Sequence, residues 1–100
     1  MNLDELRAKI DLTDKEIIRL FEERMKIAKE IGDYKKDNNL PVLDVIREKH
    51  KLSEIVDLTS DEFKSYTSVL YSLLFELSRS YQGKICNHST ALYAEIENAV

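Results

Sequence analysis

Five side chains interrupt otherwise apolar helical patterns with a positive charge or an amide. They are Arg7, Arg24, Lys35, Arg47 and Gln82. A cation buried in a helical bundle costs free energy unless a negative group meets it. That group need not belong to the protein, because a small molecule with two carboxylates would satisfy the same cations. These residues are therefore candidates for a site that binds a small dianion.

Two of the cations are spaced to act on one ligand from one helix. Arg24 and Lys35 are 11 residues apart, which is about three helical turns, so they share a face within roughly 20°. Their Cα atoms lie about 16 Å apart on an ideal helix, which two long side chains can span. Arg7 lies about 25 Å from Arg24 along the axis and on another face, so it would have to come from a second chain. Taken singly, each cation is more simply explained as a salt-bridged or solvated charge.

Two later segments add polar side chains at helical spacing. One carries four charged residues at i, i+3, i+4 and i+7, which places them on one helix face. They are Asp44, Arg47, Glu48 and Lys51. In the other, Ser78 and Gln82 stand one turn apart and both can donate hydrogen bonds, while Glu76 and Arg79 are expected to face solvent. The alternatives are an exposed salt-bridged face and a helix end that becomes polar as it leaves the core.

The helix that carries Arg24 and Lys35 is the first in the chain and is predicted over residues 3–38. Asn2 with Glu5 resembles a capping box, and Asp37-Asn38-Asn39 ends the pattern. One line of a heptad repeat runs through Leu3, Ile10, Ile17, Arg24 and Ile31, and the other through Leu6, Thr13, Leu20, Ile27 and Tyr34. Such a helix is about 54 Å long, whereas a compact domain of this size has a radius of gyration of about 13 Å. Its ends need cover from a second chain, which predicts a homodimer.

Two further helices complete an all-α chain. Pro41 suits the first turn of a helix that runs to about Val56. Residues 57–60 are predicted as a loop, with Thr59 and Glu62 as a second capping box. The third helix is predicted to end at Gly83. We therefore expect one domain over residues 1–83 and a tail or linker over residues 84–100.

The composition limits the classes of function. With 100 residues, 43% of them hydrophobic, and only two Gly and one Pro, the chain suits one small helical domain. A net charge of −4 argues against nucleic acid as the main partner. One cysteine and no signal-peptide pattern favour the cytoplasm, and no apolar run is long enough to cross a membrane. The two histidines have no second ligand at metal spacing, so a metal site is not expected.

Together these residues resemble the all-helical bacterial chorismate mutases, over residues 3 to about 83. The resemblance is carried by Leu6-Arg7-Ala8-Lys9-Ile10, by Asp14, Ile17, Leu20, Arg24, Met25, Ala28, Ile31, Gly32 and Lys35, by Pro41-Val42 with Asp44, Arg47 and Glu48, and by Ser78 with Tyr81-Gln82. It implies an intertwined homodimer with two sites, each built mainly from one chain, and it implies that Arg7 enters from the other chain. Lys51 and Arg79 depart from it, because these positions can be apolar in close relatives.

The resemblance also implies a reaction, the intramolecular pericyclic rearrangement of chorismate to prephenate, with no cofactor or metal. The resemblance implies that Arg7 and Arg24 bind the carboxylates of this dianion and that Arg47 orders the pocket. It implies that Lys35 and Gln82 donate hydrogen bonds to the ether oxygen. It also implies that Glu48 and the Asp44 backbone hold the ring hydroxyl and that Ser78 holds the ring carboxylate. These groups would orient a flexible substrate and meet developing negative charge. Two alternatives stay open: an isochorismate pyruvate lyase, which shares the fold and much of the pocket, and a non-catalytic helical dimerisation or regulatory module.

Overall fold

A computed structural model of the chain describes residues 1–86, 96, 98 and 99. Its elements are the helices α1 (Leu3–Asp37), α2 (Val45–Leu58) and α3 (Lys64–Ile85), with a 3-10 turn η1 (Asp61–Phe63) before α3. No strand occurs in the part of the chain that the structure describes. The predicted all-α class with a very long first helix is confirmed. Most of the predicted tail lies outside the described residues, and the proposed division at residue 83 stays a prediction.

Helix α1 begins where its capping residues predict. The Asn2 side chain accepts a hydrogen bond from the Glu5 backbone N–H (2.9 Å), and the Asn2 backbone N–H donates to the Glu5 carboxylate (3.4 Å), which is the predicted capping box. At the other end, the Asn38 N–H donates to the Tyr34 carbonyl (3.0 Å). Asn39 then adopts a left-handed conformation (φ 53°), which asparagine tolerates better than most residues, and the chain turns away.

Helix α2 begins later than predicted, because Asp44 rather than Pro41 marks its start. The Asp44 carboxylate accepts a hydrogen bond from the Arg47 backbone N–H (3.0 Å), so it satisfies a donor that the first turn leaves free. The predicted capping box at Thr59 and Glu62 is also wrong. The Thr59 hydroxyl points backwards and donates to the Ile55 carbonyl (2.9 Å), which closes the C-terminal end of α2.

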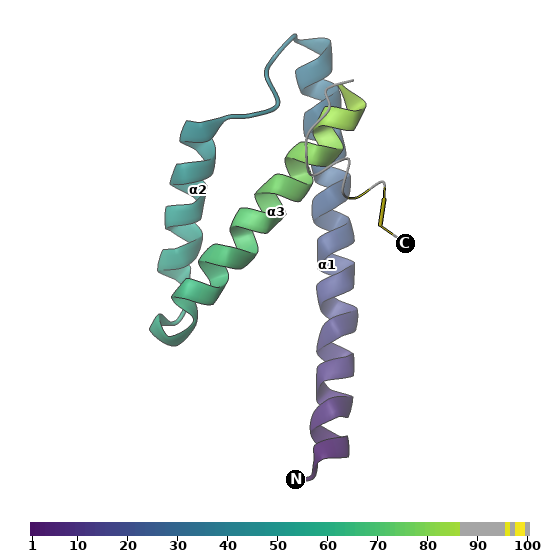
Figure 1. The fold of residues 1–100 in the computed structure, drawn as a ribbon, viewed down its shortest axis with the longest axis vertical. Coiled ribbons are helices and arrows are strands. Elements are labelled where there is room, and N and C mark those ends of the chain that lie inside the picture. The colour runs from purple at the N-terminus through teal and green to yellow at the C-terminus, as the bar shows by residue number, and fades with distance from the viewer. Residues whose placement is uncertain (87–95, 97, 100) are drawn as a thin grey trace.

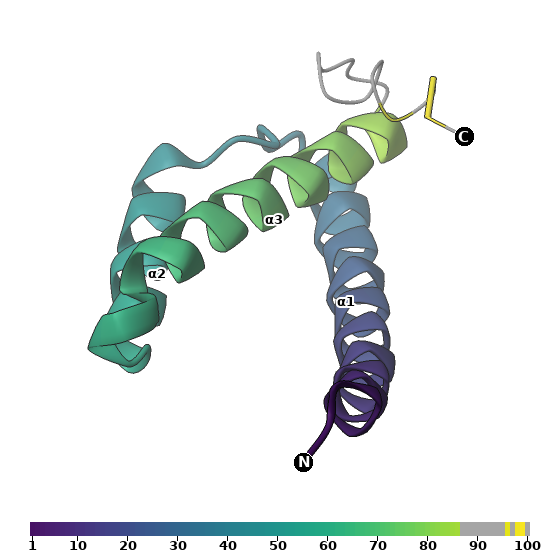
Figure 2. The same ribbon diagram turned by 60° about the horizontal axis from the view of Figure 1, so that its bottom comes forward.

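Helix α3 joins the other two helices and continues past its predicted end. It runs diagonally from the end of α2 to the C-terminal part of α1, while the N-terminal part of α1 projects away (Figures 1 and 2). Gly83 lies inside this helix and is buried, so the prediction that the helix stops there is wrong. Gly32 of α1 permits the close approach: a Cβ atom there would lie 3.3 Å from both Gln82 Cγ and Ile85 Cδ1.

The core of the single chain is small. Among the described residues, Ala28 and Phe75 are the only buried hydrophobic side chains, and every residue from Met1 to Leu20 is exposed. The radius of gyration is 16.2 Å, and the molecule measures 54 × 33 × 22 Å. The heptad residues of α1 are therefore not covered by their own chain; Ile10, for example, keeps 61% of its surface. None of the described helices is both long and apolar enough to span a bilayer.

Candidate active site

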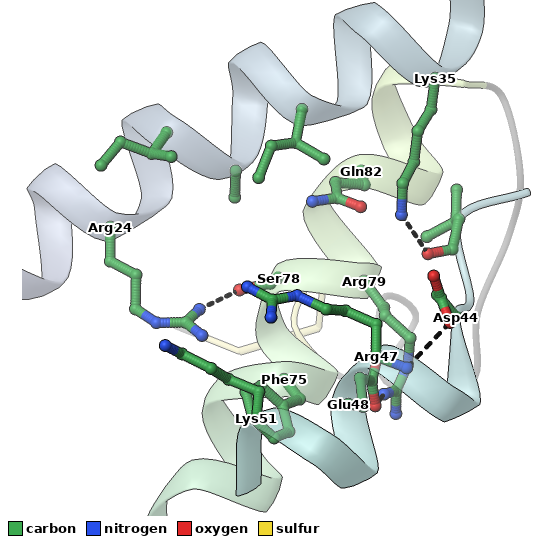
Figure 3. Close-up of a pocket in the computed structure, with 14 residues that line it drawn as sticks. Arg24, Lys35, Asp44, Arg47, Glu48, Lys51, Phe75, Ser78, Arg79 and Gln82 are labelled. Atoms are coloured by element: carbon green, nitrogen blue, oxygen red, sulfur yellow. Dashed lines mark hydrogen bonds and ion pairs between the residues drawn. The ribbon is translucent and has the colours of Figure 1, made fainter. Parts of the chain in front are cut away.

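A cavity of about 540 Å³ lies between the C-terminal half of α1, the start of α2 and the second half of α3 (Figure 3). It is lined by Arg24, Ile27, Ala28, Ile31, Lys35, Val42, Asp44, Arg47, Glu48, Lys51, Phe75, Ser78, Arg79 and Gln82. The structure thus brings together every predicted site residue except Arg7. Arg7 is exposed on the N-terminal half of α1 and does not line this cavity.

Helix α1 supplies one wall through a single stripe of residues. Arg24 and Lys35 both line the cavity, as their shared helix face predicts, and Ile27 and Ile31 lie between them. The Lys35 ammonium donates one hydrogen bond to the Val42 carbonyl (2.7 Å), which ties the helix to the loop before α2. An ammonium has three donors, so Lys35 retains two for a ligand.

Arg24 is held in place from α3. Its Nη1 donates a hydrogen bond of 2.5 Å to the Ser78 hydroxyl oxygen, and its guanidinium carbon lies 5.7 Å from the centroid of the Phe75 ring. Phe75 is 8% exposed, so its ring offers Arg24 a fixed cation–π surface. Because Ser78 accepts from Arg24, the hydroxyl hydrogen of Ser78 stays available to donate to a ligand.

Gln82 places a neutral amide at the same end of the cavity as Lys35 (Figure 3). The residue is 6% exposed, and its side chain makes no hydrogen bond within the part of the chain that the structure describes. Its Cγ packs against Gly32, so the close approach of α1 and α3 fixes its position. Its NH₂ group is therefore available to donate hydrogen bonds to a ligand atom in the cavity.

Helix α2 presents its four charged residues to the cavity, as their spacing predicts. Asp44 and Arg47 stand at the helix start, followed by Glu48 and Lys51. The Lys51 ammonium also lies 3.5 Å from the Glu54 carboxylate. Asp44 and Arg47 are exposed and Lys51 pairs with Glu54, as in a salt-bridged face, and all four residues also line the cavity between the three helices.

The prediction for the orientation of the Arg79 side chain is wrong. We expected it to face solvent, yet its side chain is only 27% exposed and forms an ion pair with Glu48 across α2 and α3. Glu76 is exposed, as predicted. The spacing of Phe75, Ser78, Arg79 and Gln82 is i, i+3, i+4 and i+7, which is one helix face. This pattern could have identified both Phe75 and Arg79 from the sequence.

Three exposed ion pairs on α1 lie outside the cavity, those of Arg19 with Glu16 and Glu23 and that of Lys29 with Asp33. The hydrogen bond and charge of Glu16 raise the pKa of Arg19, and the hydrogen bond and charge of Asp33 raise the pKa of Lys29. Within the described residues, no group of three or more His, Cys, Asp or Glu side chains could hold a metal ion. Besides the carboxylates of Asp44 and Glu48, the cavity offers cations, an amide and a hydroxyl, which suit a small ligand with two negative groups.

Comparison with known proteins identifies relatives of this chain. The chain is 43% identical over 61 residues to a bifunctional chorismate mutase/prephenate dehydratase of Aquifex aeolicus, a match covering 61% of this chain and 17% of that protein. It is 33% identical over 94 residues to a protein of the same name from Buchnera aphidicola, covering 88% of this chain and 24% of the relative. The chain thus spans about a quarter or less of the length of these relatives. No solved structure gave a significant match.

A family model also matches most of the chain. Residues 6–83 match the model of chorismate mutase type II, and this range includes all eight predicted site residues and nearly all of the three helices. The chain therefore belongs to the chorismate mutase type II family.

Proposed function

We propose that this chain catalyses the rearrangement of chorismate to prephenate in the cavity between its three helices. The observation that carries the proposal is the convergence of donors on one small cavity. Arg24 stands at one end, and Lys35 and the amide of Gln82 stand at the other. Chorismate carries two carboxylates and an ether oxygen, and these donors match that set of acceptors.

The reaction breaks the ether C–O bond and forms a C–C bond within one molecule, so the protein needs to orient the substrate and stabilise charge. Arg24, together with Arg7 from a second copy, binds the carboxylates, for which guanidinium groups offer a bidentate geometry, and Arg47 helps to order the pocket. Ser78 donates its free hydroxyl hydrogen to the ring carboxylate, and the ring hydroxyl contacts Glu48 and the Asp44 backbone. Lys35 and Gln82 donate to the ether oxygen, which becomes negative as its bond to carbon lengthens. Donors fixed in advance at such a position typically contribute about 3–4 kcal/mol each.

The proposal includes a homodimer in which a second copy supplies Arg7. It is supported by the exposure of every residue from Met1 to Leu20, including the heptad residues that would pack on another helix. Monomeric proteins rarely expose an apolar face of this length. A second copy lying along α1 would cover this face and would bring its own Arg7 towards the cavity. We also place the activity in the cytoplasm, where the single thiol of Cys86 would stay reduced.

The direct test is turnover of chorismate by the purified protein. We expect the diene absorbance of chorismate to fall and prephenate to be identified as the product. Release of pyruvate from isochorismate without formation of prephenate would instead identify a lyase. A folded dimer that converts neither compound would identify a non-catalytic module.

A further inference from the structure

Arg79 and Glu48 form an ion pair unlike any other that the described residues make. It joins α3 to α2, and the two side chains keep only 27% and 25% of their surface. The other described ion pairs connect residues three or four positions apart. Surface pairs of that kind contribute little, whereas a partly buried pair between two elements holds both side chains in fixed positions.

This pair also forms part of the cavity wall. A second hollow of about 260 Å³ lies between α2 and α3, and Glu48, Phe75 and Arg79 line both it and the main cavity. The ion pair and the Phe75 ring therefore separate the two spaces. Any change in the pair would alter both the shape of the main cavity and the charge that faces it.

The negative charge of Glu48 faces a cavity that would bind a dianion, and Arg79 offsets this charge. Two carboxylates, Asp44 and Glu48, line a cavity that would bind a dianion. Asp44 already accepts a hydrogen bond from the Arg47 backbone N–H at the helix start. An unpaired Glu48 carboxylate would repel the substrate, because like charges oppose each other at close range in a partly buried site. Arg79 binds the Oε1 atom of Glu48 and offsets this charge, while Oε2 makes no hydrogen bond within the described residues.

We propose that Arg79 is a positioning residue that acts on the substrate through Glu48. Its guanidinium offsets the Glu48 charge and fixes the carboxylate, so that Oε2 can accept a hydrogen bond from the ring hydroxyl. The inference rests on the proposed function and deepens it, because it explains how a carboxylate can serve a site for a dianion. Arg79 is thus a determinant of substrate affinity and does not itself contact the substrate.

A double-mutant cycle separates this role from direct binding. The variants are Arg79→Met, Glu48→Gln and the two combined, with KM and kcat for chorismate measured for each. We expect Arg79→Met to raise KM about tenfold, with a smaller change in kcat, because it leaves Glu48 charged and unpaired. In the Glu48→Gln background, the same Arg79→Met change should leave KM within about twofold, because there is no longer a charge to offset. If Arg79→Met raises KM equally in both backgrounds, Arg79 binds the substrate directly and the inference is overturned.

Two controls keep the result interpretable. Arg79→Lys preserves the charge on a shorter side chain, so its KM should lie closer to wild type than that of Arg79→Met. Arg19→Met removes an arginine from the exposed pair with Glu16 (3.0 Å), and we expect it to change neither KM nor kcat. If Arg79→Met alone does not fold, the comparison of Glu48→Gln with the combined variant still decides the question. A folded wild-type protein that does not convert chorismate would overturn the proposed function and this inference with it.

Discussion

The two halves of α1 carry the same heptad pattern but have different surroundings. Residues 3–20 are exposed throughout, whereas the second half packs on α3, where Ala28 and Gly32 are buried. The cavity lies entirely beside the second half. Even in the second half the heptad residues stay exposed, since Ile27, Ile31 and Tyr34 keep 49%, 45% and 62% of their surface. The contact with α3 is therefore made by small residues that lie off the repeating apolar line, and the line itself is left for a partner along both halves.

The largest effect is expected from combining one variant in the N-terminal half of α1 with one in its C-terminal half. We expect Arg7→Ala and Lys35→Ala homodimers each to lose activity by about 10²–10³-fold, because each lacks one donor to the substrate. When the two variants are unfolded and refolded together, a heterodimer has one site with both defects and one site with neither. Activity should therefore return. If heterodimers form but stay inactive, Arg7 does not act across the interface.

The variant Gln82→Glu tests the part of the site that comes from the three helices of one chain. A carboxylate in place of the amide can only accept hydrogen bonds, and its charge would oppose the charge that develops on the ether oxygen. We expect Gln82→Glu to lower kcat at neutral pH by roughly 10²-fold. Activity should rise as pH falls through the pKa of the introduced carboxyl group, near or above ~4.3, because only its protonated form donates.

The measurement for Gln82→Glu is kcat against pH for both proteins, with folding checked at each pH by circular dichroism. The wild-type chemical step should vary little across the neutral range, because an amide does not titrate there. Equal activity of the variant and the wild type at pH 7 would show that Gln82 does not face the breaking bond.

A substitution among the exposed heptad residues of α1 tests whether a second copy packs on them. Ile10→Asp places a charge where a second copy would pack, and it should destabilise the dimer by about 2 kcal/mol or more per chain. Lys15→Asp is the matched control, because Lys15 lies off both heptad lines and is exposed. We expect only Ile10→Asp to raise the Kd of the dimer, so that the dimer dissociates at a higher protein concentration and its thermal stability falls more steeply on dilution. A stable, compact wild-type monomer at working concentration would rule out the dimer.

The smallest expected effect concerns the contact between the two helices beside the site. In Gly32→Ala, the new methyl group would lie 3.3 Å from Gln82 Cγ, so the glutamine must move by a few tenths of an ångström. We expect kcat to fall severalfold while the free energy of unfolding changes by about 1 kcal/mol or less, since alanine also favours the helix. Ala8→Gly, in the exposed half, changes helix propensity alone and should leave kcat unchanged.

The sequence by itself determined most of the helical architecture. The Asn2 capping box and the unbroken heptad correctly predicted α1, and the spacing of charges predicted which residues of α1 and α2 share a face. These are local properties of one helix, and helical geometry fixes them. The helix ends predicted at Pro41, Thr59 and Gly83 are wrong: Asp44 caps the start of α2, the Thr59 hydroxyl donates back to the Ile55 carbonyl, and Gly83 lies buried inside α3.

The tertiary structure alone decided which side chains of different helices meet. A charge near the end of a helix usually faces solvent, which is the prediction for Arg79, yet the crossing of α2 and α3 places Arg79 against Glu48. Phe75 becomes the platform for Arg24 only because α3 crosses the second half of α1. Such contacts depend on the angle and distance between helices, which are set by packing over the whole chain and by close approaches such as that at Gly32.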